Sequence, residues 1–204
     1  MVDPLTLLAF VPAALLLNMT PGADMMFCLG QGLRSGPRAA IMASAGIAVG
    51  GLVHAMLAGL GLGALIAARP WAFDVIRWIG VGYLLFLAVQ AFRATRATKH
   101  SGPGLSVWRA FGTGFVVNLS NPKVILFVLA FIPQFVVPAA GSILGQFLIF
   151  GAVLGIGGFV INGVVGAFAA HFARRLGQHG RAFGWASSAI FVGLAARLAV
   201  LERA

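Results

Sequence analysis

Long apolar stretches dominate the hydrophobic pattern of this 204-residue chain. A helix needs about 20 mainly apolar residues to span a bilayer, and six stretches approach or exceed that length. They cover residues 5–33, 39–67, 74–92, 110–137, 142–172 and 183–201. They are continuously apolar rather than alternating, which favours helices over strands. We therefore predict an all-α integral membrane protein with six transmembrane helices, forming a single membrane domain over residues 1–204.

The first and fourth of these spans are interrupted by polar residues near their middle. The interruptions read NMTPG at 18–22 and NLSNPK at 118–123. Proline inside a helix costs roughly 3 kcal/mol, but it is tolerated at the first helical position after a capping residue. Thr20-Pro21 and Asn121-Pro122 both fit that pattern. We therefore predict that each span consists of two half-helices, whereas the prolines without this context, Pro12 and Pro133, are interpreted as simple kinks.

The two interruptions belong to an internal repeat. Its matched residues are Asn18 with Asn118, Thr20 with Ser120, and Pro21 with Pro122. In both halves the next span carries a GxxxG pattern, at Gly46/Gly50 and at Gly151/Gly155, although such a pattern alone usually marks only close helix packing. Three spans per half is an odd number, so the halves would insert in opposite orientations, as in many secondary transporters. We predict two inverted three-helix repeats, over 1–93 and 110–204, joined by a basic cytoplasmic linker over 94–109.

The distribution of basic residues predicts the orientation in the membrane. Only 9% of the residues are charged and the net charge is +10, whereas a soluble domain has about a quarter of its residues charged. Nine basic residues follow the first, third and fifth spans: Arg34, Arg38, Arg93, Arg96, Lys99, Arg109, Arg174, Arg175 and Arg181. Four lie on the opposite side: Arg69, Arg77, Arg197 and Arg203. The larger group marks the cytoplasmic face, so both termini are predicted to be periplasmic and no nucleic-acid partner is expected.

Three ionisable residues lie inside the predicted spans and are the candidates for chemistry. Asp24 follows the first interruption, Lys123 follows Pro122, and His54 lies midway along the second span. A charge at such depth costs at least ~2.5 kcal/mol, so it normally pairs or lines a functional cavity. Asp24 and Lys123 are therefore either a structural pair or groups that handle substrate or protons. His54, a residue type suited to proton transfer near neutral pH, is either a proton carrier or a polar packing residue.

Other classes of function lack support in the sequence. A single cysteine, Cys28, and scattered Asp and His residues argue against a high-affinity metal site. The chain has no G-x-x-x-x-G-K-[ST] motif for ATP-driven transport and no recognisable nucleophile–base pair for an enzyme. We expect no cofactor. Efflux of a metal or other small cation by the same architecture is the alternative to a transporter of organic molecules.

Four stretches of the chain carry a resemblance to a known family. They are MTPGAD, GLRSGPRAAIMASAGIAVGGLVHAMLAGLGLGALI, GVGYLLFLAVQAFR and FGTGFVVNLSNPKVILFVLAFIPQF. In this order they resemble the LysE/RhtB amino-acid exporters, and the TPG and NPK blocks are the more specific part. That family usually has T-P-G-P followed by Asn or Asp. Here Ala23 stands in place of the second proline, and Asp24 supplies a titratable group.

The resemblance implies a bacterial inner-membrane exporter of amino acids or close derivatives, driven by the proton-motive force. Its partners would be a small amino acid, protons and the lipid bilayer, with a homo-oligomer possible. A zwitterionic substrate suits the interruptions, because the N-terminus of a half-helix attracts a carboxylate and Asp24 would face the ammonium group. The predicted substrate-binding residues are Asn18, Thr20, Pro21, Gly22, Asp24, Asn118, Asn121, Pro122 and Lys123. Proton coupling is predicted for Asp24 or His54.

Overall fold

The computed structural model describes residues 2–68 and 105–169, with isolated positions between 75 and 89 and between 185 and 199. The α-helices are α1 (Pro4–Met19), α2 (Ala23–Ser35), α3 (Pro37–Ala68), α5 (Val107–Leu119), α6 (Pro122–Ala130) and α7 (Ile143–Ala167). Two short 3-10 helices, η1 (Ile132–Phe135) and η2 (Pro138–Ala140), connect α6 to α7. These ranges contain no strand, so the prediction of an all-helical membrane protein is confirmed at this level.

Two helices are long and apolar enough to cross a membrane alone. They are α3, over Pro37–Gly61, and α7, over Ile143–Ala167. Two bent pairs, α1 with α2 and α5 with α6, raise the number to four if each pair counts as one span. These four correspond to the stretches predicted over 5–33, 39–67, 110–137 and 142–172. The spans predicted over 74–92 and 183–201, and most of the linker over 94–109, lie outside the described residues, while 107–109 belong to α5.

The prediction that Pro133 is a simple kink in a helix continuing to residue 137 is wrong. Helix α6 ends at Ala130, and the chain continues as the 3-10 helix η1, which contains Pro133. Proline has no N–H and its ring clashes with the carbonyl four residues earlier, so it kinks or ends an α-helix. The side chain of Gln134 donates from Nε2 to the carbonyl oxygen of Ala130 at 2.9 Å. By contrast, α1 runs unbroken through Pro12.

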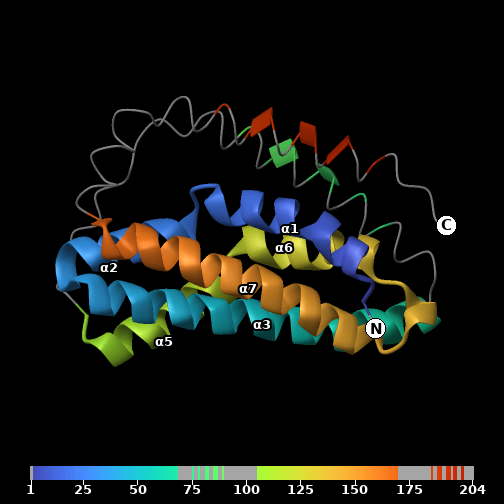
Figure 1. Ribbon diagram of the computed structural model, residues 1–204, viewed down its shortest axis with the longest axis horizontal. Helices are drawn as coiled ribbons and strands as arrows, with labels where there is room; N and C mark the ends of the chain where they lie inside the picture. Colours follow the sequence, from blue (N-terminus) through green and yellow to red (C-terminus); the bar gives the residue numbers. More distant parts are fainter. Residues whose placement is uncertain are drawn as a thin grey trace.

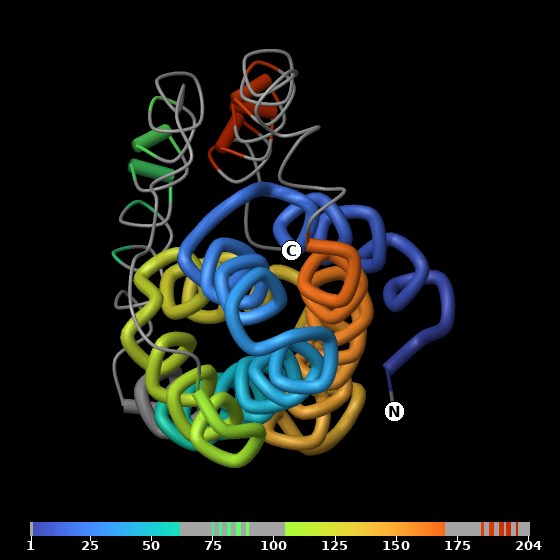
Figure 2. The backbone as a smooth tube through the Cα atoms, turned by 90° about the vertical axis from the view of Figure 1, so that its left-hand side faces the viewer, coloured from blue at the N-terminus to red at the C-terminus, as the bar shows by residue number. Residues whose placement is uncertain are grey.

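Helix α3 packs lengthwise against both α5 and α7, and this trio forms the base of the structure in Figure 1. The end-on view in Figure 2 shows α3 beside α7, with α5 on its other flank. Glycine makes the close approach possible, because a Cβ at Gly46 would overlap the backbone of Phe111 and one at Gly151 would overlap Ala55. Both belong to the predicted GxxxG patterns, whose role here is helix packing.

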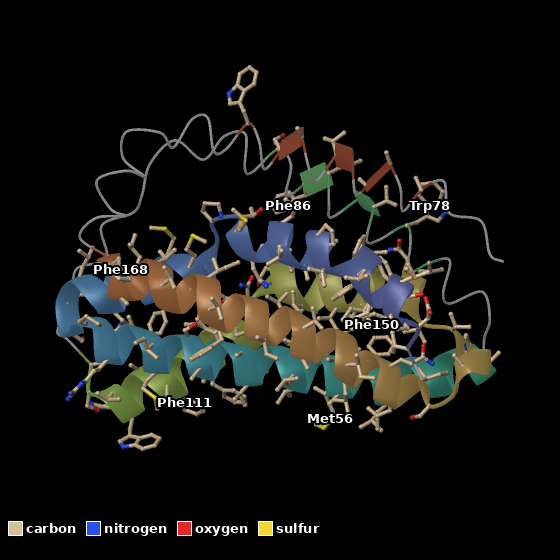
Figure 3. All side chains as sticks on the ribbon, in the orientation of Figure 1. Met56, Trp78, Phe86, Phe111, Phe150 and Phe168 are labelled. Carbon is tan, nitrogen blue, oxygen red and sulfur yellow. The ribbon has the colours of Figure 1, made fainter. Side chains whose placement is uncertain are left out.

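Side chains of α1, α6, η1 and α7 meet in an aromatic core. Five phenylalanine rings form this core, with neighbouring centroids 4.7–6.4 Å apart: Phe10, Phe127, Phe131, Phe135 and Phe150. In Figure 3 Phe150 points into the bundle, whereas Met56 points away from it. Many large apolar side chains, such as Leu57 and Ile156, are exposed on the outside. An outer surface of this kind suits contact with lipid.

Candidate functional site: a polar cavity between the helix breaks

The two helix breaks adjoin one small cavity inside the bundle. Its volume is about 30 Å³, enough for about two water molecules. Its polar lining residues are Asn18, Thr20, Asp24, Asn118, Lys123 and Asn162. The rest of the lining is apolar or small and comes mainly from α3 and α7, including Ala48, Gly51, Gly155 and Gly158. Six helices therefore contribute to the cavity, and the chain bends at 53° and 54° in the two breaks beside it.

At the first break the predicted cap is wrong. Thr20 does not cap α2; it ends α1, and its hydroxyl donates to the carbonyl oxygen of Leu16 at 2.7 Å. Pro21 forces the residue before it out of the helical region, and Thr20 accordingly has φ −70° and ψ 120°. Helix α2 then begins at Ala23 after Gly22, which provides no side-chain cap. Pro21 and Gly22 form the link and do not line the cavity.

The N-terminus of α2 has unpaired backbone donors. Within the described part of the chain, the N–H groups of Ala23, Asp24 and Met25 donate no hydrogen bond. The first N–H of α2 that is paired is that of Met26, which donates to the carbonyl oxygen of Gly22 at 3.0 Å. The positive end of a helix dipole favours negative charge. Asp24, the second residue of α2 and only 6% exposed, places its carboxylate at that end.

At the second break the predicted cap is confirmed. Asn121 caps α6 by accepting from the N–H of Lys123 at 3.0 Å, and Pro122 is the first helical residue. The next two N–H groups, of Val124 and Ile125, both donate to the carbonyl oxygen of Asn121 at 3.1 Å. Since Pro122 has no N–H, the start of α6 has no free backbone donor for a substrate carboxylate. Asn121 and Pro122 do not line the cavity.

Lys123 reaches from the second break to the first. Its ammonium donates to the backbone carbonyl oxygens of Leu17, at 3.0 Å, and Thr20, at 2.9 Å. These carbonyls are at the C-terminal end of α1, where a positive charge is favourable. Among the described residues no ion pair joins Lys123 to Asp24. The structure therefore does not contain the direct pair of charges that was one of the two interpretations. Lys123 instead caps the end of α1.

Asp24 has a different partner, the side chain of Asn118. The amide nitrogen of Asn118 donates to one carboxylate oxygen of Asp24, Oδ2, at 2.8 Å. Within the described part of the chain, the other carboxylate oxygen, Oδ1, is buried and accepts no hydrogen bond, and the same holds for the side-chain oxygens of Asn118 and Asn162. Sequence reasoning placed Asn118 in the site but not Asn162. The signal available for Asn162 was a lone amide in the middle of an apolar stretch.

His54 and Asn18 have supporting positions. The ring nitrogen Nε2 of His54 lies 3.2 Å from the carbonyl oxygen of Asn118, at the end of α5, and His54 does not line the cavity. Asn18 does line it, but its amide donates to the carbonyl oxygen of Leu154 at 2.9 Å and so connects α1 to α7. Within the described ranges, no three His, Cys, Asp or Glu side chains come together as metal ligands.

Comparisons with known proteins give a consistent result. A family model described as LysE type translocator matches residues 15–202. The homoserine/homoserine lactone efflux protein of Salmonella typhimurium is 34% identical over 170 residues, covering 82% of this chain and 80% of that protein. The leucine efflux protein of Salmonella choleraesuis is 29% identical over 202 residues, covering 95% and 94%. An uncharacterized membrane protein of Vibrio cholerae is 33% identical over 177 residues, covering 84% and 82%. No solved structure matches significantly.

Proposed function

The chain belongs to the LysE type translocator family, and from this premise we propose that it exports an amino acid or a close derivative through the cavity between the two helix breaks. One observation carries the proposal. Asp24 is a buried carboxylate beside a broken membrane helix, and one of its oxygens is unpaired at the edge of a cavity. A buried charge left in this way normally belongs to a functional site.

The names of the relatives suggest which part of the substrate is recognised. Homoserine, homoserine lactone and leucine share an α-ammonium group, whereas the lactone has no free carboxylate. We therefore assign the ammonium to Asp24. Where a carboxylate is present, the free N–H groups at the start of α2 are its natural partners, together with the third N–H of Lys123. The start of α6 is not part of this proposal, because its backbone N–H groups are already paired and Asn121 does not line the cavity.

The proposed transport cycle requires the cavity to widen. A volume of about 30 Å³ holds about two waters and is too small for an amino acid. We propose that the chain consists of six spans in two inverted repeats and that one repeat moves against the other around the breaks, as in other transporters with broken helices. The nearly equal bends of 53° and 54° support this arrangement.

We further propose that export is coupled to protons at Asp24 or His54 in the bacterial inner membrane, with both termini periplasmic. Reporter fusions at positions 100 and 178 should then be cytoplasmic, and a fusion at position 139 should be periplasmic. A cytoplasmic signal at 139 would contradict both the orientation and the inverted repeat. Efflux of a metal or other small cation is not favoured, because the relatives are named for amino acids and their derivatives.

The direct test of the function is export from cells that overproduce the protein. The cells are fed a panel of dipeptides, and each amino acid is measured as it appears in the medium. We expect one or a few amino acids to accumulate outside faster than in cells carrying the Asp24→Asn variant at equal membrane abundance. Equal accumulation of every amino acid with and without the wild-type protein would reject the proposal.

A further inference from the structure

We propose that three side-chain oxygens, those of Asp24, Asn118 and Asn162, together hold the ammonium group of the substrate, and that Asn162 makes the site selective for primary ammonium groups. This inference rests on the proposed function. It adds a residue from α7 that the sequence motifs do not include, and it adds a rule for which substrates are accepted.

The three oxygens share an uncommon state. Asp24 Oδ1, Asn118 Oδ1 and Asn162 Oδ1 are buried and accept no hydrogen bond from the residues that the structure describes. Their side chains are 6%, 2% and 4% exposed and line the same cavity. Folded proteins pair nearly all buried polar atoms, so three unpaired acceptors on residues that line one cavity favour a donor that enters this cavity.

The orientation of the Asn118 amide follows from its partner. An ionised carboxylate can only accept hydrogen bonds, so Asn118 must present its nitrogen to Asp24, as the 2.8 Å contact shows. The side-chain oxygen of Asn118 is therefore directed away from Asp24 Oδ2 and can still accept a hydrogen bond. Gly50 on α3 provides the room for this arrangement, because a Cβ at that position would lie 2.7 Å from the Asn118 oxygen.

A primary ammonium group matches this set of atoms in number and in charge. It has three N–H donors and no acceptor, and its positive charge balances the carboxylate of Asp24. Lys123 lines the same cavity, but its ammonium donates to the carbonyl oxygens of Leu17 and Thr20 and, among the described residues, pairs with none of the three oxygens. The cavity of about 30 Å³ accommodates an ammonium group, whereas the rest of the substrate requires the proposed widening.

The inference predicts discrimination against N-methylated substrates. A secondary ammonium has two donors, so it leaves one of the three acceptors unpaired, and an unpaired buried acceptor lowers binding by about tenfold or more. The probes are L-leucine and N-methyl-L-leucine, and L-homoserine and N-methyl-L-homoserine. Each is loaded into proteoliposomes that contain the full chain, and its release is measured. For the pair that the protein transports, the wild-type protein should release the primary amine about tenfold faster than its N-methyl derivative.

The variants at Asn162 separate hydrogen bonding from size. Asn162→Leu keeps a side chain branched at the same carbon but removes the acceptor, so only two acceptors remain and a two-donor ammonium satisfies both. Release of the primary amine should fall about tenfold, and the preference over the N-methyl compound should disappear. Asn162→Asp keeps an acceptor oxygen and should keep the preference. Asn162→Ala removes the same oxygen without adding apolar bulk, and it replaces the leucine variant if that protein does not insert.

The matched control is Ser44→Ala. Ser44 is buried on α3 and donates to the carbonyl oxygen of Phe159 on α7 at 2.8 Å, but it does not line the cavity. This variant should keep the preference for the primary amine even if it is less stable.

Three outcomes would overturn the inference in distinguishable ways. If the Asn162→Leu and Asn162→Ala proteins retain the preference, Asn162 does not contact the ammonium, and the proposed function stands. If wild-type release depends on sodium, and Asn162→Leu abolishes that dependence without changing the preference, the oxygens hold a metal cation. If the wild-type protein releases none of the dipeptide-derived amino acids or probes, the proposed function itself fails.

Discussion

The two helix breaks have nearly the same geometry but different hydrogen bonding. Both bend the chain by 53–54° beside the cavity. In the first, the N–H groups at the start of α2 donate to no described residue, and the carbonyl oxygens at the end of α1 accept from Lys123 in the other half of the chain. In the second, Asn121 caps α6 with its own side chain, and the carbonyl of Asn118 accepts from the N–H of Asn121 at 2.9 Å.

This difference suggests a division of roles between two repeated motifs. The first break has free donors and an unpaired carboxylate oxygen, which are the features of a binding site. At the second break the backbone N–H groups at the start of α6 are paired, and the side chains of Asn118 and Lys123 bond to the first break rather than forming a site of their own. We therefore expect substitution of Asp24 to change export, and substitutions of the residues that start α6, Asn121 and Pro122, to change mainly stability. The following predictions test this expectation.

The largest effect is expected from Asp24→Asn. The asparagine can accept from Asn118 with its oxygen, but it then directs its NH₂ group at the position proposed for the ammonium. The loss of one charged hydrogen bond costs about 1.5–3 kcal/mol, so export per molecule should fall by roughly 10-fold to 100-fold. Export is measured in proteoliposomes as the external pH is varied. An unchanged rate with an unchanged pH dependence would remove Asp24 from both binding and coupling.

The next largest effect is expected from Lys123→Gln, and it should appear in stability as well as in export. The shorter, neutral side chain leaves the carbonyls of Leu17 and Thr20 without their charged donor, which costs about 1–3 kcal/mol. The melting temperature of the purified protein should fall.

Combining this substitution with Asp24→Asn tests whether the two charges interact. Among the described residues the two side chains make no direct contact, and removing the charge of Asp24 does not restore the hydrogen bonds that Lys123 donates to Leu17 and Thr20. The double variant should therefore be at least as unstable as Lys123→Gln alone. If the double variant is more stable than either single variant, the two charges neutralise each other directly.

Much of the fold could be predicted from apolar length and proline context alone. The stretches over 39–67 and 142–172 became the long helices α3 and α7, and both polar interruptions became helix breaks. These features depend on local sequence, because span length and proline tolerance are properties of a single segment. The 3-10 ending of the fourth span also has a local cause in Pro133, which the interpretation as a kink underestimated.

The details of the site could not be predicted in the same way, because they depend on contacts between distant segments. The motif repeat suggested equal caps at both breaks, but the hydroxyl of Thr20 turns back to Leu16. Pairing Lys123 with Asp24 followed from charge alone, whereas the carbonyls at the end of α1 provide the contacts actually made. Asn162 belongs to no motif and reaches the cavity only through the packing of α7 against the broken spans.

A smaller effect is expected from Asn121→Ala at the second break. Loss of an N-cap side chain costs about 1 kcal/mol, because the N–H of Lys123 loses its acceptor. The melting temperature should fall by a few degrees, while export per molecule in the membrane should stay within about twofold of the wild type. Pro122→Ala is the companion variant. It changes the second break but keeps the Asn121 cap, so it separates the effect of the proline from the effect of the cap. A loss of export as large as that of Asp24→Asn, at equal abundance, would show that the second break also binds substrate.

The smallest effect is expected from His54→Gln. The ring nitrogen Nε2 of His54 lies 3.2 Å from the carbonyl oxygen of Asn118, and because that oxygen only accepts, the ring must donate. A glutamine amide can donate from a similar position but does not titrate near neutral pH. If Asp24 is the coupling group, export should stay within about twofold of the wild type and keep the same dependence on external pH.

His54→Leu is the control for the lost hydrogen-bond donor. It should lower the free energy of unfolding by less than about 1 kcal/mol, since the N–H of Asn121 still bonds to the same carbonyl. A pH dependence that disappears in His54→Gln but persists in His54→Leu would indicate an effect of the glutamine itself. A pH dependence that disappears in both would assign coupling to His54, and the second break would then take part in transport as directly as the first.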